Sequence, residues 1–257
     1  MSFPTVGSYL HHHVHCVRPN LAEPHPKPRE ALVTMLLVAA VFLPLSHFGI
    51  SSSPLRATLV GRIGERAYQG LYSLVSFAAF ALLIVAYRHA EARVLWVAPG
   101  SVKLAALPLV LLAFLLVVVG LTTPNPTTLG ADALLDRPNV ARGILRITRN
   151  PFLWGTALWA LAHIAATGEL TSLLFFGSIG ALGLIGAFLL DAKKARQHGQ
   201  RWQRFAAETS NLPFQAILEG RQRLVLGEIG VWRLALAIAL FGIVLVAHPR
   251  LFGVSPL

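Results

Sequence analysis

The chain has 257 residues, of which 55% are hydrophobic and only 13% are charged. Soluble domains carry about 25% charged residues, so this composition excludes an ordinary soluble protein and predicts a polytopic membrane protein. The formal net charge of +11 does not indicate nucleic-acid binding, because the basic residues lie in short loops beside apolar runs. The single cysteine, Cys16, excludes an internal disulfide and a covalently attached haem.

The first thirty residues differ from the rest of the chain. They are rich in proline and histidine and contain no apolar run that suits a signal peptide. The sequence therefore predicts a disordered tail over residues 1–30 and a transmembrane domain over residues 31–257. Met35 opens the first apolar run, so a translation start there is an alternative. A His-rich tract can bind metal, but we assign no function to it.

Six apolar runs follow the tail, each close to the 17–25 or so residues that a helix needs to cross the hydrocarbon core. They cover residues 32–50, 71–87, 102–121, 151–167, 171–190 and 231–247. The predicted fold is an all-α, polytopic membrane helix bundle with about six transmembrane helices. The loops after the first, third and fifth runs hold most of the 22 Lys and Arg residues. We expect the protein to lie in a bacterial inner membrane, and the positive-inside rule predicts that both of its termini are in the periplasm.

Three stretches between the runs are predicted to be interfacial. Ser53 and Pro54 suit the N-cap and first turn of a short helix. The stretch over residues 191–208 is basic and carries Trp202 and Phe205 one turn apart, as an amphipathic helix on a membrane surface does. A third short segment follows and ends at residue 218. These stretches would anchor the protein to the bilayer surface, or alternatively roof a pocket.

Glycines recur along the fifth apolar run. They are Gly177, Gly180, Gly183 and Gly186. Small residues let membrane helices approach closely, and their drift around the helix predicts more than one packing neighbour. No strand precedes these glycines, which argues against a nucleotide-binding loop.

Two histidines inside apolar runs are the strongest candidates for functional residues. His163 lies in the uncharged segment 151–166, and His47 lies in the first run. Ionisable groups at such depth are costly and are by default candidates for functional sites. Two imidazoles on separate membrane helices predict a ligand pair for a metal or a haem. The alternative is that each histidine only hydrogen-bonds a neighbouring helix.

Three blocks of sequence resemble a known family. They are His47 with residues 53–56 and 64–74, then residues 144–163, and finally residues 209–214 with 220–222 and 247–249. On these blocks the chain resembles the NnrU family, which is itself similar to the plant and cyanobacterial zeta-carotene isomerases. The resemblance covers about residues 40–250.

The resemblance implies a haem b whose ligands match His47 and His163. It further implies a link to nitrogen-oxide (denitrification) metabolism or redox sensing, together with a redox partner or nitrogen-oxide reductase. Haem propionates need cations, for which Arg146 and Arg149 are the candidates. Ala160 stands where the isomerases can offer a cysteine, so a redox-driven exchange of ligands is not implied.

Depth along the helices favours other ligands. His47 lies near the cytoplasmic end of its run, whereas His163 lies about 18 Å in from the same side at 1.5 Å per residue. His89 and His248 match the depth of His163 better, and they remain alternate ligands.

Other functions stay open. The related isomerases imply an alternative activity, the haem-dependent cis-trans isomerisation of a carotenoid-like polyene, so the sequence leaves open whether the protein is an enzyme. A non-haem scaffold or assembly factor is a second alternative. An arginine-rich segment before a proline also resembles membrane methyltransferases, but Asn150 replaces the histidine that those enzymes use. No acid/base pair or nucleophile set in the apolar runs indicates hydrolysis.

Overall fold

The computed structural model describes residues 28–51 and 54–256, and its regular structure in these residues is helical, without a strand. The long helices are α1 (Pro28–Ser51), α3 (Glu65–His89), α4 (Gly100–Thr122), α5 (Pro151–Thr167), α6 (Leu170–His198) and α9 (Val231–Phe252). The short ones are α2 (Pro54–Ile63), η1 (Asp132–Asp136), η2 (Gly143–Arg146), α7 (Gln200–Glu208), α8 (Gln215–Leu218) and η3 (Leu226–Glu228).

The predicted all-α membrane bundle is confirmed. Five of the described helices, α1, α3, α4, α6 and α9, are long and apolar enough to span a membrane. The run at residues 151–167 forms α5, which at 17 residues is at the lower limit for crossing the hydrocarbon core. Each of the six predicted apolar runs therefore lies within one long helix of a multi-pass membrane protein.

The beginning of the chain is described only in part. The predicted tail up to residue 27 and the predicted N-cap Ser53 lie outside the described residues. Helix α1 starts at Pro28, slightly before the predicted domain boundary at residue 31.

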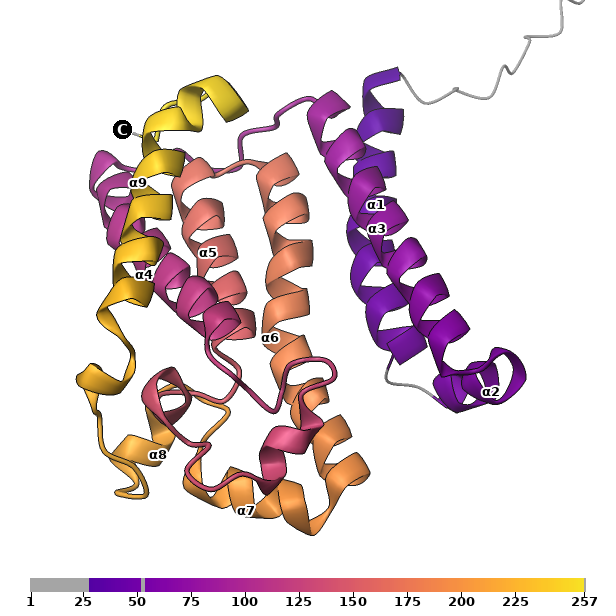
Figure 1. Cartoon of the computed structure of the whole chain (residues 1–257). Helices are drawn as coiled ribbons and strands as arrows, with labels where there is room; N and C mark the ends of the chain where they lie inside the picture. The colour runs from indigo at the N-terminus through magenta and orange to yellow at the C-terminus, as the bar shows by residue number, and fades with distance from the viewer. Residues whose placement is uncertain (1–27, 52–53, 257) are drawn as a thin grey trace, which may run out of the picture.

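Helix α6 joins the two parts of the bundle (Figure 1). On one side it packs against α1, which forms an antiparallel pair with α3, and on the other side it packs against α5. Helix α5 in turn packs against α4, and α4 packs against α9. The chain ends its helical part in α9, at the opposite edge of the bundle from α1 and α3.

Glycines allow α5 to approach both of its neighbours closely. A Cβ atom on Gly183 of α6 would stand 2.6 Å from the carbonyl oxygen of Leu153, and one on Gly155 would stand 2.9 Å from that of Ala113 in α4. Around Gly186, both Phe48 of α1 and Leu153 of α5 lie 3.9 Å from the corresponding position. The predicted close packing along this glycine run, with more than one neighbour, is thus confirmed.

The short helices gather at one end of the bundle (Figure 1). The predicted interfacial stretch from residue 191 does not begin there, because α6 continues to His198 and α7 follows. Trp202 and Phe205 of α7 are buried in a cluster with Leu145 of η2. These two aromatic side chains therefore pack on protein rather than on lipid.

Candidate functional site

His47 lies one turn before the end of α1 and is half-buried. Its Nδ1 is 3.0 Å from the carbonyl oxygen of Leu43, and its ring meets Tyr72 of α3 edge-on, with centroids 5.7 Å apart. A carbonyl oxygen only accepts, so Nδ1 carries the proton and the neutral ring keeps its lone pair on Nε2. That is the tautomer a metal ligand needs.

His163 lies one turn before the end of α5 and is also half-buried. Its Nδ1 is 2.8 Å from the carbonyl oxygen of Trp159, which fixes the same tautomer. Its ring stacks on Phe176 of α6 and contacts Trp159, each with a centroid distance of 4.7 Å. The imidazole thus stands in an aromatic environment at the α5–α6 contact.

The two histidines lie at different depths in the bundle. Phe48 and Leu153 flank Gly186, so the end of α1 lies level with the start of α5. His163 comes ten residues after Leu153, or about 15 Å further along the helix. Two imidazoles on one haem iron each need a nitrogen about 2 Å from the metal. The donor chemistry therefore suits haem, while the difference in depth argues against a shared iron for His47 and His163, and their pairing stays a prediction.

The alternate ligands lie nearer the level of His163. His89 ends α3 and is exposed, whereas His248 lies near the end of α9 and is half-buried. Each Nδ1 also contacts a carbonyl oxygen, that of Val85 at 2.9 Å and that of Val254 at 2.8 Å. His248 is close enough to His163 to act on it electrostatically. Which histidines bind a haem stays a prediction, and the described residues contain no group of three or more metal-binding side chains.

Arg146, a predicted propionate ligand, holds two loops together. Its Nε and Nη2 donate to the two carboxylate oxygens of Glu228 in η3, at 2.8 and 2.9 Å, and its Nη1 contacts Gln222. The backbone N–H of Gly143 donates to the same carboxylate at 2.8 Å. The hydrogen bonds from Arg146 and then from Gly143 lower the pKa of Glu228 to about 2.

Gly143 is required at this contact for two reasons. Its φ of 57° lies in the left-handed region, which side chains rarely adopt. A Cβ there would also stand 3.0 Å from the carbonyl oxygen of Glu228.

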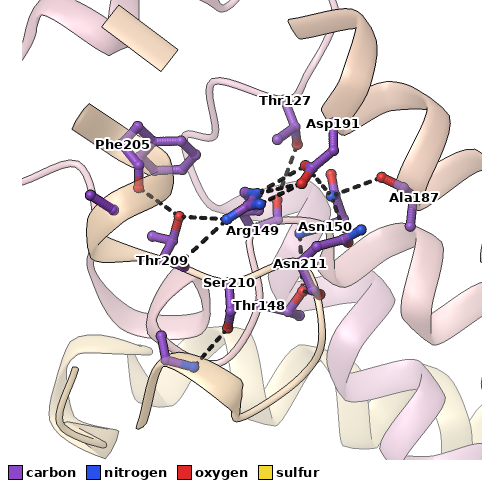
Figure 2. A network of polar contacts seen from close by, with 12 residues as sticks. Thr127, Thr148, Arg149, Asn150, Ala187, Asp191, Phe205, Thr209, Ser210 and Asn211 are labelled. Atoms are coloured by element: carbon purple, nitrogen blue, oxygen red, sulfur yellow. Dashed lines mark hydrogen bonds and ion pairs between the residues drawn. The ribbon is translucent and has the colours of Figure 1, made fainter. Parts of the chain in front are cut away.

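Arg149, the second predicted propionate ligand, lies at the centre of a polar cluster at the start of α5 (Figure 2). Its guanidinium makes a bidentate ion pair with Asp191 of α6, with Nε 2.9 and 3.0 Å from the two carboxylate oxygens. The guanidinium also lies 5.7 Å from the centroid of the Trp202 ring. Its side chain is 11% exposed, so the charge is buried and compensated by Asp191.

The backbone of Arg149 joins three segments. Its N–H donates to the carbonyl oxygen of Ser210 at 2.9 Å. Its carbonyl oxygen accepts from Asn125 and Thr127 in the loop after α4, at 2.9 and 3.2 Å. The start of α5, the loop after α4 and the segment after α7 are therefore fixed at one point, as Figure 2 shows in part.

Asn150 and Asn211 form the buried part of this cluster. Nδ2 of Asn150 lies 3.0 Å from Oδ1 of Asn211 and 3.1 Å from Oδ1 of Asp191. Oδ1 of Asn150 and Nδ2 of Asn211 are buried and have no partner among the described residues. Buried polar atoms are normally satisfied, so this acceptor and this donor are exceptions within an otherwise paired cluster.

The two resembling blocks at residues 144–163 and 209–222 thus come together in space. Thr148 donates to the carbonyl oxygen of Asn211, and the N–H of Phe214 donates to that of Ile147, at 2.6 and 2.8 Å. Sequence reasoning missed the two acidic partners, Asp191 and Glu228. Both could have been found from the sequence, because each is an acidic residue within a strongly basic segment, where an ion pair is favoured.

Comparison with known proteins shows the family of the chain. The family described as NnrU protein matches residues 34–256. Two relatives are named 15-cis-zeta-carotene isomerase, chloroplastic: the Zea mays protein is 30% identical over 199 residues, and the Arabidopsis thaliana protein is 29% identical over 204. These matches cover 75% and 77% of this chain but 52% and 53% of the relatives, so the chain spans about half of their length. No solved structure shows a significant match. The match over nearly all of the described residues shows that this chain belongs to the NnrU family.

Proposed function

We propose that this protein is a membrane-embedded isomerase that converts a cis double bond of a long, carotenoid-like polyene to trans. The observation that carries the proposal is the similarity to two 15-cis-zeta-carotene isomerases over three quarters of the chain. The similarity includes the membrane-embedded helices, where an apolar lipid would be bound.

The polar groups of the site are consistent with such a reaction. Isomerisation changes the geometry of the substrate but none of its atoms, so it needs no hydrolytic acid/base pair. Arg146 and Arg149 are bound to carboxylates, and these pairs hold loops in place rather than donate protons. The chain's own residues would bind the polyene, orient it and exclude water.

The test is turnover of a defined substrate. The purified full chain in mild detergent would be incubated in darkness with 15-cis-zeta-carotene, with and without dithionite, and the isomers separated by chromatography. We expect a protein-dependent conversion of the central double bond of the substrate from cis to trans. Equal rates with heat-inactivated protein would overturn the proposal.

Haem b remains the proposed cofactor, and His163 is its best-placed ligand candidate. The aromatic surroundings of His163 and the free lone pair on its Nε2 support this choice, while His47, His89 and His248 compete for the second position. Absorption spectra of the oxidised and reduced protein test it: we expect a Soret band that His163→Ala abolishes. Full wild-type spectra in both His47→Ala and His163→Ala would refute the pairing of these two residues.

Redox sensing or electron transfer to nitrogen-oxide reductases is the competing function. It rests on the family resemblance, and it predicts a haem spectrum that shifts with nitric oxide but no polyene turnover. The same preparation therefore separates the two functions. A spectrum without a Soret band, after expression with ample haem, would favour the scaffold alternative.

A further inference from the structure

An apolar cavity of about 400 Å³ lies between the last turns of α4 and the first turns of α5. The turn at residues 213–214, η3 and the start of α9 complete its wall. Its volume falls in the range of about 300–1,000 Å³ that is usual for small-molecule sites. Because the first turns of α5 line it, the cavity lies at the same end of the bundle as the Arg149 cluster.

Each side chain that lines the cavity is hydrophobic or aromatic, among them Leu115, Leu116 and Val119 of α4. The one polar side-chain atom in the wall, Nε1 of Trp154, is 3.3 Å from Oδ1 of Asn211, to which it donates a hydrogen bond. The wall therefore offers nothing to water, and apolar cavities of this kind stay dry or bind apolar ligands. A hydrocarbon segment is the occupant that fits.

Trp154 connects the cavity to the polar cluster. Its ring forms part of the wall, while its N–H is held by Asn211, which also accepts from Asn150. A ligand in the cavity would thus touch a side chain whose orientation the Arg149 cluster fixes.

Phe214, another residue of the wall, is held in an unusual backbone conformation. Its φ of 65° is in the left-handed region, which is rare for a bulky residue and is retained mainly where surrounding structure enforces it. The hydrogen bond from its N–H to Ile147, another wall residue, enforces it here. Strain of this kind gathers at ligand sites, and it places a second aromatic residue in the wall.

We propose that this cavity binds an apolar segment of the polyene substrate and that Trp154 and Phe214 select for a conjugated chain. A planar conjugated chain presents a π-face to aromatic rings, whereas a saturated chain gains only dispersion contacts. This inference rests on the proposed isomerase function, since the relatives' names supply the substrate class.

The cavity is tested by filling it from two helices. Leu115→Trp and Leu158→Phe enlarge wall residues of α4 and α5, and two independent variants guard against misfolding of one. Leu109→Trp, at a position of α4 that is 39% exposed and outside the wall, is the matched control. Binding of 15-cis-zeta-carotene is measured by its absorbance in the protein peak on size-exclusion chromatography, after thermal unfolding has verified each fold.

We expect each filled variant to bind the polyene about tenfold more weakly, because the loss of two buried methylene contacts is sufficient for that change. Leu109→Trp should bind as the wild type does. Phe214→Leu should weaken binding of the polyene more than binding of the saturated hydrocarbon squalane.

The outcomes separate the cavity from the reaction. Wild-type binding by both filled variants, or no binding by the wild type, would overturn the inference. Binding that the filled variants lose, without any turnover, would leave the cavity assignment standing and refute the isomerase. Full turnover by the filled variants would support the isomerase and refute the assignment of the cavity as its substrate site.

Discussion

Arg146 and Glu228 illustrate what single residues contribute at the basic end of the bundle. The pair joins η2 to the loop before α9, which are 82 residues apart in the chain. Each side chain is about one-fifth exposed, so solvent screens the attraction only in part. The additional N–H from Gly143 stabilises the carboxylate form and explains why the pKa of Glu228 is depressed so far.

This ion pair makes stability depend on pH at acid values. The pKa of Glu228 falls from its ordinary 4.5 to about 2 in the folded protein. Its contribution is therefore complete above pH 4.5 and is lost as the pH falls towards 2. We expect Glu228→Gln to lower stability at pH 6 by on the order of 1 kcal/mol, after allowance for screening, and to have little effect at pH 2. Thermal unfolding in detergent at both values measures this, and an equal effect at both would contradict it.

The Arg149–Asp191 pair is more deeply placed and should matter more. The two side chains are 11% and 17% exposed. Removal of one partner from a buried pair costs about 3–5 kcal/mol, because the other charge is left without compensation. We expect a loss of this size for Arg149→Ala, and a smaller loss for the double variant Arg149→Ala/Asp191→Ala than the two single losses combined.

The matched control is the exposed pair of Arg201 and Asp136, whose side chains are 38% and 60% exposed. Asp136→Ala should cost at most about 1 kcal/mol. Thermal unfolding of all four variants is the measurement. Arg149→Ala and Asp136→Ala of similar stability would show that burial of the first pair has no energetic consequence.

At the scale of single residues, the sequence identified only one partner of each ion pair, the arginine. Arg146, Arg149 and Asn150 were recognisable as parts of a block that resembles the NnrU family, but their partners were not. Asp191 lies 42 residues after its partner Arg149, and spacing along the chain does not reveal which loops a membrane bundle brings together. The pairing depends on helix packing, which residue patterns do not encode directly.

The helices themselves were predictable because bilayer thickness sets their length. Each apolar run became one helix, and even the short run at residues 151–167 agrees with α5 at both ends. The largest error was the end of α6, which continues to His198. Charged side chains after Asp191 suggested a surface helix, yet Lys194 is buried and paired with Asp132, so the helix continues on protein contacts that hydropathy does not show.

The α5–α6 contact gives a prediction for one helix pair. A Cβ on Gly183 would stand 2.6 Å from a backbone carbonyl oxygen of α5, whereas one on Gly177 meets nothing within 4 Å. Gly183→Ala must push the helices apart, and overpacking of this kind costs about 1–3 kcal/mol. Gly177→Ala should leave stability unchanged or slightly raised. Unfolding midpoints in detergent compare the two, and a tolerated Gly183→Ala would disprove the close contact.

For the whole molecule, the order of helices decides which residues can act together. Helix α6 stands between α1 and α5, so the two predicted ligands His47 and His163 belong to helices that it separates (Figure 1). The sequence already indicated that their depths differ. With the contacts around Gly186 as the reference level, the difference along the helix axis is about 15 Å. A haem between this pair would require the α1–α3 pair to move relative to α5.

The distribution of charge predicts the orientation of the whole bundle. The arginines of η2, α7 and the adjoining loops lie at one end, where the short helices gather (Figure 1). The positive-inside rule assigns this end to the cytoplasm and the end of α9 to the other side. Single cysteines introduced after Cys16→Ser can test this. Gly227→Cys lies at the basic end, where a side chain meets nothing within 4 Å, and Val254→Cys lies just past α9 and is 59% exposed.

A membrane-impermeant maleimide added to intact bacterial spheroplasts should label Val254→Cys at once. It should label Gly227→Cys only after the membrane is permeabilised, because the two residues are on opposite sides of the bilayer. The reverse pattern would invert the bundle, and the Arg149 cluster and the apolar cavity would then face the periplasm, where a polyene or a redox partner would have to approach from outside the cell.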